Sequence, residues 1–113
     1  MTSTLRLRRQ ADFRRVLQKG GRARRGSVRA AVVQRGDDGA ARVGFRVAKS
    51  AGGAVSRNRA RRRLRAIVAG LDLVPGQDVV LQAGPDVATK GFEDLVHDVE
   101  EALRRAEARS VRR

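Results

Sequence analysis

Cysteine, tryptophan and tyrosine are absent from this chain of 113 residues, which contains only three phenylalanines and one histidine. The absence of cysteine excludes a disulfide framework, a thiol nucleophile and a cysteine zinc site. No apolar stretch approaches the ~20 residues that span a membrane, and the N-terminus lacks the continuous hydrophobic region of a secretion signal. We therefore expect a soluble, cytoplasmic protein with no membrane partner.

Residues that commonly carry enzyme chemistry are few and isolated. His97 is the only histidine, and on a helix it would lie opposite the apolar residues, which indicates a solvated side chain and not a general base. Asp37 and Asp38 adjoin Gly39, where the hydrogen bonds of a turn explain them better than a metal ion does. We therefore expect no catalytic residue and no metal ligand in the polypeptide.

Positive charge, by contrast, is abundant and unevenly distributed. Residues 1–65 carry 20 Lys and Arg against 3 Asp and Glu, a balance of +17, whereas residues 66–113 carry 6 against 9, a balance of −3. Such a field favours association with nucleic acid, because neutralised phosphates release counterions. A membrane-surface helix would need bulky apolar residues opposite its charges. The predominance of arginine over lysine fits codon usage in a G+C-rich genome as well as selection for guanidinium groups.

Six arginines lie within ten residues of one segment that also has a helical period, Ser56-Arg57-Asn58-Arg59-Ala60-Arg61-Arg62-Arg63-Leu64-Arg65. At about 100° per residue, one arc of this helix collects the apolar residues Ala60, Leu64, Ile67, Val68 and Leu71. Another arc collects Asn58, Arg61, Arg62 and Arg65. Because guanidinium groups match the bidentate geometry of phosphate, the segment predicts a helix with one packed face and one face for a polyanion.

The remaining elements follow from periodicity and turn residues. A short helix containing Phe13, Val16 and Leu17 should end at Gly20-Gly21. Strands are expected over 28–33, 42–48 and 78–83, with a hairpin turn at Asp37-Asp38-Gly39 between the first two. The arginine helix should run from about 54 to 71. Thr89 should cap a final helix whose apolar stripe is Phe92, Leu95, Val96, Val99 and Leu103.

This order of elements indicates an α+β fold of one sheet with packed helices. The length suits a single domain over 1–113, with flexible ends at about 1–6 and 108–113. In the strand over 42–48, alternation directs Val43, Phe45 and Val47 toward the core. Its other face, which includes Gly44 and Arg46, can accept a ligand.

The segment from Val43 to Arg65 resembles the signature of the bacterial ribonuclease P protein subunit, with its Arg-Asn-Arg core at Arg57, Asn58 and Arg59. Similarity extends to Asp12-Phe13, to Pro75-Gly76-Gln77-Asp78 and to Leu95, and so covers nearly the whole chain. The resemblance implies a single four-stranded sheet with three helices in the order α-β-β-β-α-β-α. It also implies an unusual left-handed βαβ crossover around the arginine helix, against the common hand.

The resemblance further implies a subunit of an RNA-based endoribonuclease. The catalytic RNA, with magnesium, would remove the 5′ leader of precursor tRNA, and the protein would bind both RNAs to promote this 5′ maturation. By family position, the residues that contact the catalytic RNA would be Lys49, Arg57, Asn58, Arg59, Arg61, Arg62 and Arg65. The leader would cross a cleft bordered by Phe13, Leu17 and Arg46.

The chain departs from the family pattern at several positions. Leu17 and Ala31 stand where aromatic residues are frequent, which leaves Phe13 as the one candidate for stacking of leader bases. For Phe13 a role in the core stays open, and for Arg57 a stem packed along the core edge. The alternative function is that of a ribosomal or other structural RNA-binding protein. A DNA-binding nucleoid protein ranks third, and we expect no DNA partner.

Overall fold

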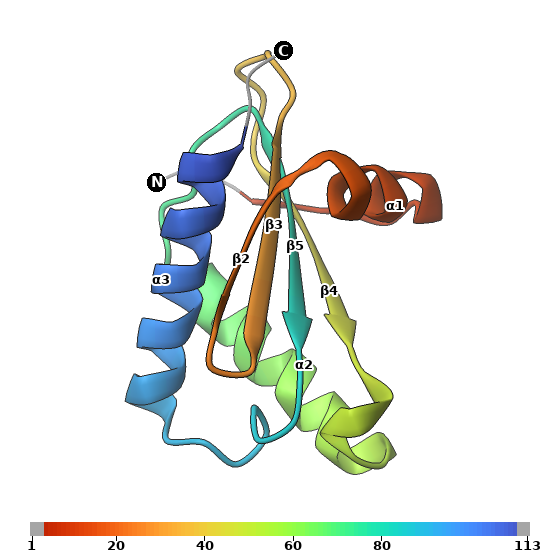
Figure 1. Ribbon diagram of the computed structural model, residues 1–113, viewed down its shortest axis with the longest axis vertical. Helices are drawn as coiled ribbons and strands as arrows, with labels where there is room; N and C mark the ends of the chain where they lie inside the picture. Colours follow the sequence, from red (N-terminus) through yellow and green to blue (C-terminus); the bar gives the residue numbers. More distant parts are fainter. Residues whose placement is uncertain (1–3, 111–113) are drawn as a thin grey trace.

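A mixed sheet of five strands carries three α-helices in the computed structural model, which describes residues 4–110 (Figure 1). In chain order the elements are β1 (Leu5–Arg6), α1 (Gln10–Lys19), β2 (Gly21–Arg25), β3 (Val28–Gln34), β4 (Arg42–Val47), the short 3-10 helix η1 (Lys49–Ala51), α2 (Ala54–Ala69), β5 (Gln77–Ala83) and α3 (Phe92–Arg109). The strands lie in the order β1-β4-β5-β3-β2. The α+β class and the predicted order from the first helix onward are confirmed.

The predicted number of four strands is wrong, because a fifth strand, β1, lies at one edge of the sheet. β1 runs parallel to β4. The Leu5 amide donates to the Ala41 carbonyl at 2.8 Å, and the Leu7 amide donates to the Val43 carbonyl at 2.9 Å. Two paired residues are too few to show a period of two in a sequence. β1 also occupies part of the N-terminal segment, at about residues 1–6, that was expected to be flexible.

The C-terminal end is also bonded to the body of the protein. The Arg109 side chain donates to the Arg22 carbonyl at 2.7 Å. The Gln34 amide group donates to the Ser110 hydroxyl at 3.0 Å. Residues 1–3 and 111–113 of the predicted flexible ends lie outside the described residues, so mobility of the ends stays a prediction.

The predicted hairpin between β3 and β4 is wrong. β5 lies between these strands, antiparallel to β3 and parallel to β4. The residues from Asp37 to Gly39 therefore form part of a loop that crosses the end of β5, and a Cβ on Gly76 would lie only 2.1 Å from the Asp37 carbonyl oxygen. The hairpin instead joins β2 and β3, with Gly26 at φ 59°. α2 connects the parallel strands β4 and β5, and the left hand of this crossover stays a prediction.

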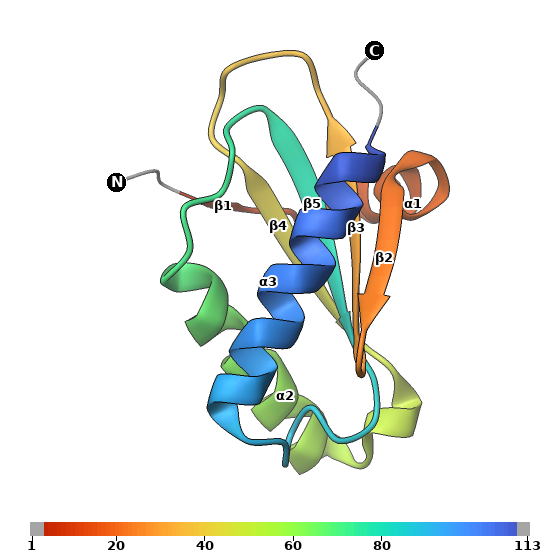
Figure 2. The same cartoon turned by 60° about the vertical axis from the view of Figure 1, so that its left-hand side comes forward.

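Two apolar cores lie on opposite faces of the sheet. The larger core joins the sheet to α2 and α3, and includes Leu64, Leu81 and Leu95, which are fully buried. The smaller core lies under α1 around Val16 and Val80. Figure 2 shows α3 crossing one face of the strands while α1 lies on the far side of β2 and β3. Because α1 is short, it leaves part of its face of the sheet uncovered.

Both α2 and α3 begin directly after a glycine, and no side-chain hydrogen bond caps either helix at its N-terminus. α2 begins at Ala54 after Gly52, which has φ 110°, a region that favours glycine. α3 begins at Phe92 after Gly91, so the predicted cap at Thr89 is wrong. The Thr89 hydroxyl donates instead to the Asp86 carbonyl at 3.3 Å, within the turn that precedes the helix.

Candidate nucleic-acid interface

The side of α2 that faces away from the core carries the arginines expected from the sequence. Ala60, Leu64, Ile67 and Val68 are buried against the sheet, as the apolar arc predicts. Four residues on the opposite side line one shallow groove together with Val55, and we call them the α2 face: Asn58, Arg61, Arg62 and Arg65. Within this set, Arg61 Nη1 donates to Asn58 Oδ1 at 3.5 Å. The helix therefore brings together four of the seven residues expected to contact the catalytic RNA.

The other three expected contact residues lie apart from this groove. Arg57 is half-buried, and its Nε is buried without a hydrogen-bond partner among the described residues, which favours an arginine stem packed along the core edge. Arg59 is exposed on α2. Lys49 is exposed on η1, where its carbonyl accepts a hydrogen bond from the Gly52 amide at 3.2 Å. Contact of these residues with RNA stays a prediction.

None of the predicted cationic site residues forms an ion pair within residues 4–110; they are Arg46, Lys49, Arg57, Arg59, Arg61, Arg62 and Arg65. Cations at such density, without carboxylate partners, repel one another. An anionic partner would remove this repulsion, and a phosphate backbone supplies the matching charge. The surface is therefore suited to a polyanion.

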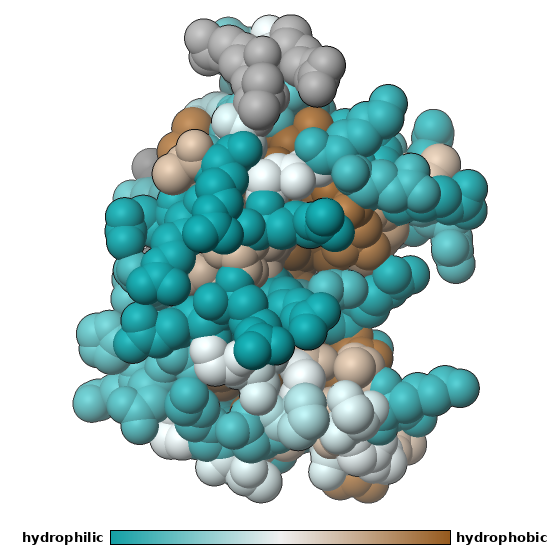
Figure 3. All heavy atoms as spheres, in the orientation of Figure 1, coloured by the Kyte–Doolittle hydropathy of each residue, from teal (hydrophilic) through white to brown (hydrophobic). Residues whose placement is uncertain are grey.

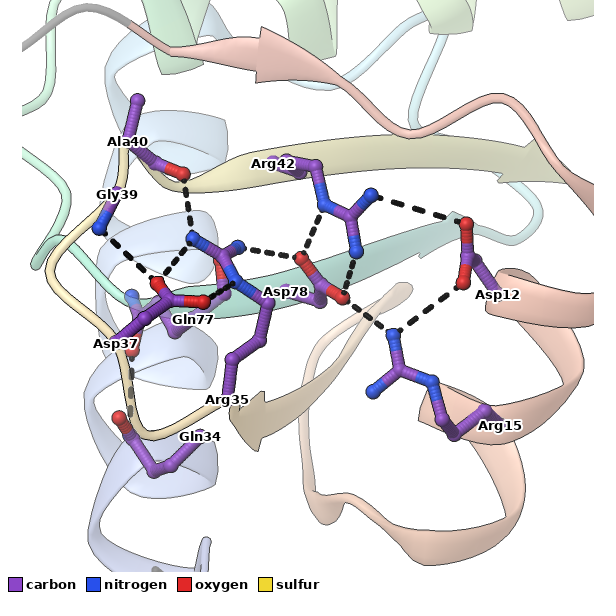
Figure 4. Close-up of polar contacts among 10 residues, drawn as sticks. All are labelled: Asp12, Arg15, Gln34, Arg35, Asp37, Gly39, Ala40, Arg42, Gln77 and Asp78. Atoms are coloured by element: carbon purple, nitrogen blue, oxygen red, sulfur yellow. Dashed lines mark hydrogen bonds and ion pairs between the residues drawn. The ribbon is translucent and has the colours of Figure 1, made fainter.

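Other arginines form ion pairs within the protein (Figure 4). The carboxylate of Asp78 on β5 has no exposed surface, and guanidinium groups from three elements surround it. Its partners are Arg15 at 2.5 Å, Arg35 at 2.7 Å and Arg42 at 2.7 and 2.8 Å. We call these four residues the Asp78 cluster. It joins α1, β4, β5 and the loop after β3, and so fixes α1 and this loop to one face of the sheet.

The ionisation of Asp78 follows from these contacts. Burial alone would raise the pKa of this carboxyl, but hydrogen bonds from Arg42, Arg15 and Arg35 lower it to about 2. The group is therefore an anion at neutral pH and neutralises arginines that sequence alone would count as free. In the sequence Asp78 stands out only as part of the Pro-Gly-Gln-Asp segment, and its role could not be predicted there because its partners lie 36 to 63 residues away.

Arg63 is a second arginine with a structural role. Its guanidinium donates to the carbonyls of Val87 and Lys90 at 2.6 and 2.5 Å, and lies 5.7 Å from the centre of the Phe92 ring. These contacts connect α2 to the segment before α3. Arg63 therefore differs from its neighbour Arg62 although both belong to the same run of arginines.

The three residues expected to border the leader cleft do not line one common hollow. Leu17 lines a hollow with Arg24 and Arg29 below α1, whereas Arg46 lines an adjoining hollow near the β2-β3 turn. Figure 3 shows apolar atoms gathered below α1, where the outline is hollowed, among hydrophilic side chains. The open face of the sheet thus offers two adjoining hollows, one bordered by Leu17 and the other by Arg46.

Phe13 lies at the other side of α1. Its ring packs against Gly44, where an added Cβ would come within 2.3 Å of Phe13 Cζ. The ring also belongs to the smaller core and borders a hollow that contains Arg61 and Arg65 of α2. The structure therefore places Phe13 beside the α2 face, and favours packing as one of its roles.

The described residues contain no group suited to hold a metal and no helix suited to cross a membrane. Between residues 4 and 110, no three His, Asp or Glu side chains are grouped where they could hold an ion. Over the same range, no helix is long and apolar enough to span a bilayer. His97 is exposed on α3, as expected.

Comparison with known proteins places the chain in a family. The family model for ribonuclease P matches residues 1–107. The ribonuclease P protein component of Clavibacter michiganensis is 34% identical over 98 residues, which cover 85% of this chain and 87% of that protein. That of Beutenbergia cavernae is 43% identical over 102 residues, covering 87% and 84%.

Solved structures share the fold. The RNase P protein of Staphylococcus aureus superposes with a TM-score of 0.77 at 23% identity, over 95% of this chain and 99% of that one. The RNase P protein of Thermotoga maritima gives a TM-score of 0.76 at 23% identity, over 88% and 96%. Both comparisons show the same architecture, and the sequence match over nearly all of the chain gives the assignment. The chain belongs to the ribonuclease P protein family.

Proposed function

We propose that this chain is the protein subunit of ribonuclease P, which binds the catalytic RNA and the 5′ leader of precursor tRNA and promotes the removal of that leader. The α2 face would contact the catalytic RNA, together with Lys49, Arg57 and Arg59. The leader would cross the open face of the sheet near Leu17 and Arg46. Family membership favours this function over that of a ribosomal protein or a DNA-binding protein.

The observation that carries the proposal is the uncompensated charge of α2. Arg61, Arg62 and Arg65 share one groove and have no carboxylate partner among the described residues. By contrast, each arginine of the Asp78 cluster forms an ion pair with Asp78 within the protein. An anionic RNA would therefore gain most binding free energy at α2, where no carboxylate of the described residues competes with phosphate for these guanidinium groups.

Phe13 connects the two proposed contact regions. Its position beside Arg61 and Arg65 brings the α1 side of the cleft close to the α2 face. We propose that leader and catalytic RNA approach each other along this edge of the sheet. Any stacking on Phe13 would use the ring surface that Gly44 does not cover.

Catalysis would reside in the RNA subunit, and magnesium would act there. The residues between 4 and 110 offer no fitting set of donors for a metal ion, and His97 has no described partner for acid-base chemistry. The protein would supply affinity and relief of repulsion between the two RNAs. Its working compartment would be the cytoplasm, where precursor tRNA is made in bacteria.

Reconstitution tests this division of labour. Purified protein with magnesium and precursor tRNA should bind without cleavage, and addition of the cognate catalytic RNA should release the 5′ leader. The benefit of adding protein should be greatest at low salt, because repulsion between the RNAs is least screened there. Cleavage by rigorously RNA-free protein would contradict the proposal, as would a catalytic RNA that gains nothing from the protein.

A further inference from the structure

A hollow of about 700 Å³ lies at the β1 edge of the sheet, on the face that α2 covers. Val43 and Phe45 line it from β4, and Val68 and Leu71 line it from α2 and the residues just after that helix. All four side chains belong to the larger core or pack against it. Sites for small organic ligands commonly have roughly 300 to 1,000 Å³ and a mostly apolar lining. This hollow, which we call the β1 hollow, therefore has the size and lining of a ligand site.

The rim of the β1 hollow carries charged side chains. Arg6 of β1, Arg65 of α2 and Asp72 are exposed and also line the hollow. Register pairs Arg6 with Val43, and residues paired in this way point to the same face of a sheet. The Arg65 guanidinium lies 5.8 Å from the centre of the Phe45 ring, at the distance of a cation-π contact. An apolar and aromatic interior is thus entered between cationic groups.

The β1 hollow adjoins the α2 face. Arg65 lines the groove of the α2 face, the β1 hollow and the hollow beside Phe13. Arg6 and Phe45 line the last two of these as well. An RNA strand whose phosphates contact Arg61 and Arg65 therefore passes the mouth of the β1 hollow.

The combination of interior and rim matches an unpaired nucleotide of RNA. Proteins commonly read RNA through unstacked bases, which stack on aromatic rings or on guanidinium planes. Phe45 and Arg65 supply both kinds of surface, and the positive charge at the rim attracts the phosphates on either side of such a base. An apolar peptide side chain would leave Arg6 and Arg65 without a counter-charge, so the rim favours an anionic chain.

We propose that the β1 hollow binds one unpaired base of the catalytic RNA, which enters between Arg6 and Arg65, and that guanine is the preferred base. This inference rests on the proposed function, and it adds a base contact to the phosphate contacts of the α2 face. The ionised carboxylate of Asp72 only accepts hydrogen bonds, and guanine presents N–H donors at both N1 and N2 on one edge. Because base contacts specify sequence while phosphate contacts fix position, the hollow lets the protein recognise one site on its RNA.

Nucleotide titration of the free protein tests the chemistry of the ligand. Guanosine 5′-monophosphate should shift the methyl NMR signals of Val68 and Leu71, and should do so at lower concentration than uridine 5′-monophosphate. Ribose 5-phosphate, which carries a phosphate without a base, should leave these signals in place. Asp72→Asn should abolish the preference for guanosine 5′-monophosphate. Equal shifts with ribose 5-phosphate would contradict base binding, and equal responses to the two nucleotides would contradict the preference for guanine.

A variant that fills the β1 hollow tests its role in RNA binding. Ala69 lines the hollow and is exposed, so Ala69→Phe occupies the space without changing the charge. Affinity for the cognate catalytic RNA at ~0.15 M salt should fall by about tenfold, as expected for the loss of one stacked base. The slope of log affinity against log salt should not change, because no phosphate contact is lost.

Ala66→Phe is the matched control, because Ala66 is exposed on the same helix and does not line the hollow. Both variants should melt near the unmodified protein, and the control should keep its RNA affinity. Equal affinities of Ala69→Phe and Ala66→Phe would overturn the proposal, as would a loss accompanied by a lower salt slope, which indicates lost phosphate contacts. If the unmodified protein does not bind the catalytic RNA, the proposed function falls and the base site falls with it. If that protein binds and the two variants are equal, the base site alone falls.

Discussion

The Asp78 cluster and the α2 face use the same side chain for opposite purposes. In the cluster, one fully buried carboxylate is surrounded by Arg15, Arg35 and Arg42. On α2, Arg61 and Arg65 project into a groove without any carboxylate partner in the described part of the chain. Arginines of the first kind stabilise the fold, and arginines of the second kind leave charge available for RNA. Net charge alone cannot separate the two kinds.

The comparison also explains why a chain with such a high positive charge folds. Where guanidinium groups must approach the sheet, the protein supplies Asp78, or the backbone carbonyls that Arg63 contacts. Where they point to solvent, repulsion is reduced by water and salt. The arginines of the α2 face belong to this second class, so they can be changed without removing the ion pairs of the Asp78 cluster.

The largest effect should follow removal of the buried charge. Asp78→Asn leaves three guanidinium groups around a neutral amide, and breaking a buried ion pair in this way costs about 3 to 5 kcal/mol. Denaturant unfolding should show this loss of unfolding free energy. Asp38→Asn, at an exposed position in the nearby loop, is the control and should change stability little. Equal stabilities of the two variants would show that the cluster does not support the fold.

Acid should weaken the Asp78 cluster in a defined range. The pKa of Asp78 is about 2 in the folded protein against an ordinary value of 3.8. Because the folded pKa is the lower one, the stabilisation is complete above about pH 4 and is lost as the pH falls through about 2. The contribution amounts to about 2 kcal/mol. Unfolding free energies measured across this range that do not decrease toward low pH would contradict the assignment.

A smaller effect should distinguish two adjacent arginines of α2. Arg63→Met keeps the apolar stem but leaves the carbonyls of Val87 and Lys90 without their donor, at a cost of about 1 to 2 kcal/mol. Arg62→Met, at the exposed neighbouring position, should leave the melting temperature nearly unchanged and weaken RNA binding. Calorimetry and RNA titration of both variants give the comparison. A larger loss of stability in Arg62→Met than in Arg63→Met, or a larger loss of RNA affinity in Arg63→Met, would contradict this distinction between the two arginines.

Sequence patterns predicted the elements whose cause is local. The period of Leu64, Ile67 and Val68 located α2 and its exposed side, because a helix repeats its environment every few residues. Alternation in the segment over 42–48 correctly separated Phe45, on the core side, from Arg46. The family resemblance added the candidate contact residues, whose roles in RNA binding stay predictions.

Features that depend on distant partners could not be predicted from the sequence. The hairpin at Asp37 to Gly39 was a reasonable turn, but β5, from much later in the chain, inserts between its strands. Asp78 gave no signal of burial, because its three arginines come from separate segments. The alignment of Arg24, Arg29 and Arg46 across the open face of the sheet also depends on the register of four strands. Phe13 was expected in a cleft with Arg46 and lies instead beside Arg61.

The central claim is that the α2 face binds the catalytic RNA and does not stabilise the fold. The most direct measurement is RNA affinity and melting temperature of Arg61→Glu with Arg65→Glu, compared with Arg104→Glu and Arg105→Glu on α3. The account predicts that the α2 variant loses at least about tenfold in RNA affinity at ~0.15 M salt. The slope of log affinity against log salt should fall by about one for each lost phosphate contact. The melting temperature should stay close to that of the unmodified protein. RNA affinity equal to that of the α3 variant, or a loss explained entirely by unfolding, would contradict it.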